Sequence, residues 1–95
     1  MTDIEKAELK AKLQMIYEHY GKYQFAKCLE ELQELIEAIN LYIVSGYSDG
    51  LKGHVIEELA DVWIMITQII MMLNAENDEY KKYKVERQLG RMALE

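Results

Sequence analysis

Apolar residues recur at three- and four-residue steps along most of the chain, the spacing of a helix packed on one side. The pattern predicts four helices, over residues 3–20, 22–44, 51–73 and 77–94. Thr2 or Asp3 would cap the first helix, and Asn77 would cap the last. Glycine- and serine-containing segments separate the helices, and the short connection between the second and third favours an antiparallel pair.

The second and third predicted helices carry the strongest apolar rows. In the second helix the row is Leu29, Leu32, Ile36, Ile39 and Ile43. In the third it is Val55, Leu59, Val62, Ile66, Ile69 and Leu73, with a second row of Ile56, Trp63 and Ile70 beside it. We expect these rows to form the core. A helix that is apolar on two sides needs partners on two sides, which predicts a second subunit.

Composition excludes several classes of protein. The absence of proline and the presence of only five glycines argue against a multi-stranded β fold, and 51% hydrophobic residues argue against a disordered chain. The single cysteine, Cys28, cannot form an internal disulfide and is expected to be a buried thiol in a reducing cytoplasm. The charged N-terminus lacks a signal-peptide pattern, and the longest apolar run, residues 62–73, is too short for a membrane span. We expect one cytoplasmic domain over residues 1–95.

The negative charge is local. The net charge of −6 arises entirely between residues 25 and 70, where eight acids face two bases, Lys27 and Lys52. Nine acids and nine bases balance in the remainder. Because a phosphate backbone attracts a basic surface, no nucleic-acid partner is expected.

Two carboxylate pairs lie within this acidic segment. Glu31 and Glu34 share one face of the second predicted helix, and Glu58 and Asp61 share one face of the third. The pairs differ in depth by about one helical turn, measured from the connection, so they can face each other. Clustered carboxylates repel unless a cation compensates, and all-oxygen ligands favour a hard divalent cation: Mg²⁺, Mn²⁺ or Ca²⁺. The alternative is two solvated acidic faces.

Two further groups are candidates for substrate contact. Aromatic residues crowd around Gly21 and could stack on a nucleobase or serve as ordinary core: Tyr17, Tyr20, Tyr23 and Phe25. Near the C-terminus, Lys84, Arg87 and Arg91 share one helix face, which suits either phosphate contact or solvent.

The acidic motifs resemble those of the MazG-like, all-α nucleoside triphosphate pyrophosphohydrolases, whose pattern is EExxE, a spacer and ExxD. Here the pattern is Glu30-Glu31-x-x-Glu34 followed by Glu58-x-x-Asp61, and the likeness to small phage-type and bacterial single-domain members extends over about residues 17–91. The resemblance implies a four-helix bundle completed by subunit association, as a homodimer or homotetramer. It also implies Mg²⁺-dependent hydrolysis of (deoxy)nucleoside triphosphates to the monophosphate and pyrophosphate.

The resemblance also implies roles for individual residues. Glu31, Glu34, Glu58 and Asp61 would hold the metal, and Glu31 would also orient or deprotonate the attacking water. Gln24, Lys84 and Arg87 would contact the substrate. Two alternatives stay open: a phosphoribosyl-ATP pyrophosphohydrolase, which shares the fold, and a non-enzymatic acidic helical protein that binds or regulates a partner.

Overall fold

The computed structural model describes residues 1–75 and 78–95, and within these ranges the chain is helical and contains no strand. Its elements are α1 (Asp3–Tyr20), the short 3₁₀ turn η1 (Gly21–Tyr23), α2 (Gln24–Val44), α3 (Asp49–Leu73) and α4 (Asp78–Met92). The all-α prediction is confirmed, with bounds close to those expected. Thr2 caps α1 through a reciprocal pair of hydrogen bonds with Glu5. The cap expected at Asn77 lies outside the described residues.

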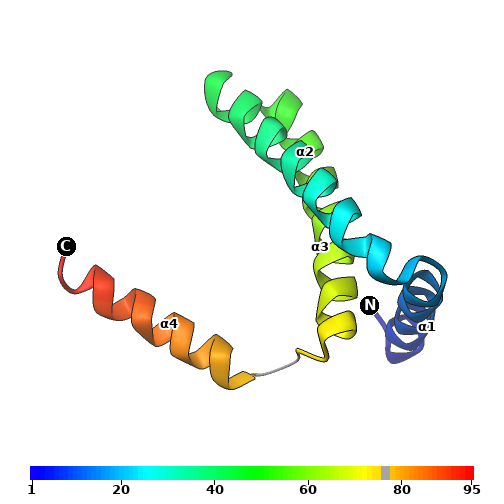
Figure 1. Ribbon diagram of the computed structural model, residues 1–95. Helices are drawn as coiled ribbons and strands as arrows, with labels where there is room; N and C mark the ends of the chain where they lie inside the picture. Colours follow the sequence, from blue (N-terminus) through cyan, green and yellow to red (C-terminus); the bar gives the residue numbers. More distant parts are fainter. Residues whose placement is uncertain (76–77) are drawn as a thin grey trace.

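The α2–α3 turn is shorter than the sequence suggested. Gly46 and Tyr47 adopt positive φ angles of 75° and 63°, which reverse the chain within a few residues. Ser48 then caps α3 by accepting a hydrogen bond from the Gly50 amide at 3.2 Å, so the helix begins two residues earlier than expected. Figure 1 shows the result, a long antiparallel hairpin of α2 and α3 with α1 at its open end.

The helices of this hairpin meet along an unusually polar stripe. On α2 the buried residues are Gln24, Cys28, Glu31 and Ala38, at steps of three, four or seven. On α3, Val62 and Met65 are buried at matching positions. Cys28 is therefore buried, as expected, and Ala38, 1% exposed, is small enough to let the two backbones approach closely.

The prediction that the large apolar rows form the core holds only in part for the single chain: Val62 of the α3 row is buried, but most of the large side chains in these rows are not. Leu29 and Ile36 on α2 are 66% and 58% exposed, and Trp63 and Ile66 on α3 are about half exposed. These exposed side chains lie one residue after the buried or half-buried positions of each helix, about 100° around the helix axis. Because the two right-handed helices run antiparallel, equal offsets turn both rows to the same side of the hairpin. We call the result the apolar face: Leu29, Leu32, Ile36, Ile39 and Ile43 of α2, and Ile56, Leu59, Trp63, Ile66, Ile70 and Leu73 of α3.

The acids occupy the other side of the hairpin. Glu30, Glu34 and Glu37 lie one residue before the buried stripe of α2, and Glu57 and Asp61 lie one residue before that of α3. By the same geometry they share the side opposite the apolar face. The hairpin therefore has an acidic face and an apolar face, separated by its own narrow core.

The outer helices differ in how they attach. Buried Gln68 of α3 donates a hydrogen bond to the Leu13 carbonyl of α1 at 2.9 Å, and buried Gln24 donates to the Ile16 carbonyl at 3.4 Å. In contrast, α4 extends away from the hairpin, and all of its residues are exposed (Figure 1). A single chain thus forms a hairpin with α1 docked on it, and the expected four-helix bundle is not formed within it. No helix in the described parts of the chain combines the length and apolarity needed to span a membrane.

Candidate metal centre

Three of the four predicted carboxylate ligands converge between α2 and α3. Glu31 and Glu34 of α2 and Glu58 of α3 each offer one oxygen, and these oxygens lie within 4.8 Å of one another. The early start of α3 brings them together. With that helix beginning at Asp49, the two carboxylate pairs stand at depths that differ by about one residue, or about 1.5 Å along the helix axes, instead of a full turn.

Two of these carboxylates are largely removed from solvent. The side chains of Glu31 and Glu58 are only 11% and 13% exposed. The Oε2 atom of each is buried and has no hydrogen-bond partner among residues 1–75 and 78–95. A buried carboxylate oxygen without a donor is costly, because its lost hydration is not replaced. A divalent cation bound by these oxygens would supply the missing partner, so the residues present fit the expected metal.

Asp61, the fourth predicted ligand, is not part of this group. It is exposed and lies one turn beyond Glu58 on the same face of α3. The structure therefore assembles a three-carboxylate centre, with Asp61 at its solvent edge. Its role as a ligand stays a prediction.

The electrostatics of the centre reflect crowded negative charge. Repulsion from Glu31, desolvation and repulsion from Glu58 raise the pKa of Glu34 above its usual value. Lys27 compensates in part, since its Nζ lies 3.1 Å from Glu31 Oε1 and 3.5 Å from Glu30 Oε1. The hydrogen bond and charge of these glutamates raise the pKa of Lys27. His54 Nδ1 lies 4.0 Å from Glu58 Oε1 and would form an ion pair when protonated.

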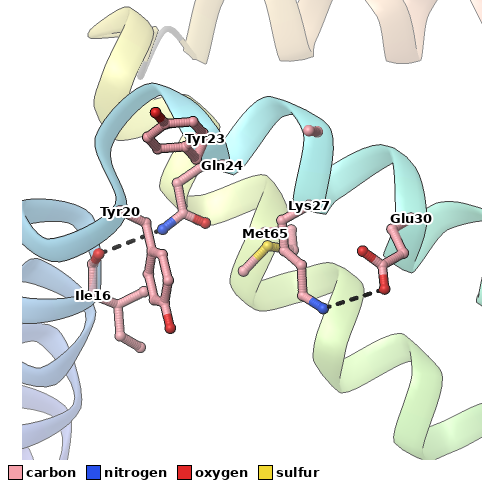
Figure 2. A pocket seen from close by; sticks show the side chains of 8 residues that line it. Ile16, Tyr20, Tyr23, Gln24, Lys27, Glu30 and Met65 are labelled. Carbon is pink, nitrogen blue, oxygen red and sulfur yellow. Dashed lines mark hydrogen bonds and ion pairs between the residues drawn. The ribbon is translucent and has the colours of Figure 1, made fainter.

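A cavity of about 500 Å³ adjoins the centre, a size that suits a small organic ligand. Tyr20, Tyr23 and Gln24 gather at one end of it, at the junction of α1 and α2, while Lys27 and Glu30 lie at the other (Figure 2). Ile16, Ala26 and Met65 complete its lining, which is mostly apolar. The structure thus places Tyr20 and Gln24, two predicted substrate contacts, in a cavity that is connected to the carboxylates through Lys27.

The predicted phosphate contacts lie elsewhere. Lys84 and Arg87 are on α4, which stands apart from the carboxylate centre in the single chain (Figure 1). The Lys84 ammonium lies over the ring of its neighbour Tyr83, 5.9 Å from the ring centroid. Any contact of these two residues with a ligand at the centre would require a different placement of α4 or a second copy of the chain.

Lys27 is the site residue that the sequence analysis missed. It was counted only as one of two bases in the acidic segment. The signal was available, because Lys27 lies three residues before Glu30 and four before Glu31, the spacings at which helical side chains of opposite charge pair.

Comparisons with protein-family models, with curated proteins and with solved structures find no match to this chain. The resemblance to the MazG-like family stays a prediction, and the function proposed below rests on the residues of the centre and of the adjoining cavity.

Proposed function

We propose that the protein is a divalent-metal-dependent pyrophosphohydrolase that converts (deoxy)nucleoside triphosphates to the monophosphate and pyrophosphate. The observation that carries this proposal is the three-carboxylate centre with two buried, unpartnered oxygens, located beside a cavity lined by tyrosines. The all-oxygen ligand set favours Mg²⁺, with Mn²⁺ as a substitute. When bound, the metal would neutralise phosphate charge and lower the pKa of an attacking water.

The residues of the chain would bind the metal, activate the water and hold the substrate. Glu31, Glu34 and Glu58 hold the cation, and Asp61 is the expected fourth ligand at the solvent edge. Glu31 is the candidate catalytic residue that orients or deprotonates the water, because it is the most buried of the carboxylates and borders the cavity through Lys27. Tyr20 offers an aromatic face to a base, and Gln24 helps to fix that end of the cavity.

We also propose that the active form is a homo-oligomer, a dimer or a tetramer. The apolar face is too large to leave in water on a chain of this size, and two copies packed through it would produce a four-helix core from two hairpins. Such an assembly offers the route by which Lys84 and Arg87 of one copy would reach a substrate held by another. Ile36→Asp should dissociate the assembly in analytical ultracentrifugation, whereas Glu37→Asp, on the acidic face, should not.

The activity is tested by product analysis on a panel of deoxy- and ribonucleoside triphosphates, with Mg²⁺ and with a chelator. Monophosphate and pyrophosphate that form only with metal, and that disappear in Glu58→Gln but not in the matched Glu57→Gln, would support the proposal. Inorganic phosphate as the first product, or equal rates with the chelator, would refute it. Phosphoribosyl-ATP belongs on the same panel, because hydrolysis of that substrate alone would assign the alternative reaction.

The exposed apolar face also suits the second hypothesis, a non-enzymatic acidic helical protein that binds a partner. In that case the carboxylates are only surface charge. Thermal stability would then be indifferent to Mg²⁺, and no triphosphate on the panel would be cleaved.

A further inference from the structure

We propose that Lys27 is an exchangeable counter-ion of the carboxylate centre: its ammonium occupies Glu31 until a divalent cation binds, and then turns into the adjoining cavity to bind a phosphate group. This inference rests on the proposed metal centre, and it assigns a positioning role to a residue outside the expected ligand set. Through Lys27, cation binding and anion binding would favour each other.

The first observation is that Lys27 already pairs with one of the carboxylates that a cation would bind. Lys27 Nζ lies 3.1 Å from Glu31 Oε1, so the ammonium already holds one oxygen of this ligand, while Glu31 Oε2 is buried without a partner. A divalent cation on Glu31 would sit about 2.0–2.6 Å from its carboxylate oxygens. A cation on the unpartnered Oε2 would bring a second positive charge to the carboxylate whose Oε1 the ammonium already holds, and repulsion between the two charges favours departure of the monovalent ammonium.

The second observation is that the Lys27 side chain can move and that a cavity adjoins it. Its side chain is 51% exposed, so the long stem can change rotamer without leaving a hole in the core. Lys27 already lines the 500 Å³ cavity, at the end that also holds Glu30 (Figure 2). The other described residues that line this cavity are neutral except for Glu30, so Lys27 is its one positive group and the natural contact for an anionic ligand.

Charge balance links the two positions of the Lys27 ammonium, on Glu31 and in the cavity. Without metal, three carboxylates are partly neutralised by Lys27, and this residue also pairs with Glu30. With metal, the cation takes over that neutralisation and Lys27 becomes available. An anion in the cavity would then bind better when metal is present, and by linkage the metal would bind better when the anion is present.

The experiment is calorimetric titration of Mn²⁺ into the full-length protein and into Lys27→Gln. The control is Lys52→Gln, which removes the same charge from the only other base of the acidic segment. Removal of the competing ammonium should tighten Mn²⁺ binding about fivefold in Lys27→Gln. A half-exposed ion pair contributes little to stability, and breaking it on metal binding weakens the affinity by about that factor. Lys52→Gln should stay close to wild type, and Lys27→Arg, which keeps the charge, should restore the weaker affinity.

A second titration uses inorganic pyrophosphate, with and without saturating Mn²⁺. Wild type should bind pyrophosphate more tightly with metal, and Lys27→Gln should lose most of this gain. Unchanged Mn²⁺ affinity in Lys27→Gln, or an unchanged metal effect on pyrophosphate, would overturn the role of Lys27 while leaving the proposed function intact. Failure of wild type to bind Mn²⁺ at all would overturn both.

Discussion

Replacing Glu58 by glutamine should stabilise the metal-free protein and remove its stabilisation by metal. The glutamine keeps the size of the side chain and deletes one of three clustered negative charges. Its amide can also donate a hydrogen bond to the Glu31 carboxylate, whose Oε2 is buried without a partner. The same change removes a ligand, so a cation that stabilises wild type should no longer stabilise the variant.

The separation between the Glu31 and Glu58 carboxylates determines how much Glu58→Gln should stabilise the metal-free protein. The ligand oxygens of Glu31 and Glu58 lie no more than 4.8 Å apart, and both side chains are nearly buried. At an effective dielectric constant of about 20, two unit charges at this separation repel by about 3.5 kcal/mol. The charge of Lys27, which already pairs with Glu31, offsets part of this repulsion and leaves a net gain of about 1–2 kcal/mol for the variant. In a chain of this size the gain corresponds to a rise in Tm of about 4–10 °C.

Thermal melts at one fixed protein concentration test this prediction, with Mg²⁺ and with a chelator, on wild type, Glu58→Gln and Glu57→Gln. The control removes an exposed acid next to Glu58 that does not belong to the carboxylate centre. Saturation with metal at about a hundred times its Kd should stabilise wild type and the control by about 2.7 kcal/mol, and the variant by little. A Glu58→Gln protein that melts below wild type in chelator, yet gains as much from Mg²⁺, would refute the assignment of this cluster as a cation site.

Three further outcomes are expected. Repulsion from Glu31 raises the pKa of Glu34, so the folded metal-free chain holds the proton on the Glu34 carboxyl more tightly than the unfolded chain does. The free energy of unfolding should therefore fall as the pH rises above 4.5, the usual pKa of a glutamate, and level off above the raised pKa. Denaturant melts across the acidic range should show this decline in wild type and a smaller one in Glu34→Gln, and equal slopes would contradict it. Tyr20→Leu should raise KM for a triphosphate substrate about fivefold with little change in kcat, because ring stacking is lost, and a fall in kcat alone would argue against base contact. Ala38→Leu should cost about 1–3 kcal/mol in urea unfolding because it overfills the closest approach of α2 and α3, and an undiminished stability would argue against that approach.

The sequence predicted the helices well because their signals are local. The spacing of apolar residues, the positions of the glycines and the cap at Thr2 each depend on a few neighbouring residues. The helices and the cap in the structure agree with the predictions made from these signals. The start of α3 was misplaced because Gly50 looks like a helix breaker, whereas Ser48 caps the helix before it.

The pattern failed where it equated large apolar side chains with the core. Gln24, Glu31 and Gln68 occupy buried positions, while most of the large side chains in the predicted rows, Val62 excepted, are exposed. Hydrophobic periodicity finds the most apolar side of a helix, and on this hairpin, whose core includes polar side chains, that side is largely exposed in the single chain. The carboxylate positions followed from i, i+3 spacing, but the exclusion of Asp61 depends on rotamers and on the final turn geometry, which no local pattern encodes.

The docking of α1 has a consequence for how freely its sequence can diverge. Gln24 and Gln68 hold this helix by its main-chain carbonyls at Ile16 and Leu13, and Leu13 is its only fully buried residue among those described. A main-chain carbonyl is present whatever the side chain is. Substitutions along most of α1 would therefore leave these two hydrogen bonds intact, whereas a change at either glutamine, on other helices, would remove one of them. Variation in α1 should be tolerated widely outside Leu13, and the two glutamines that bind its carbonyls lie on other helices.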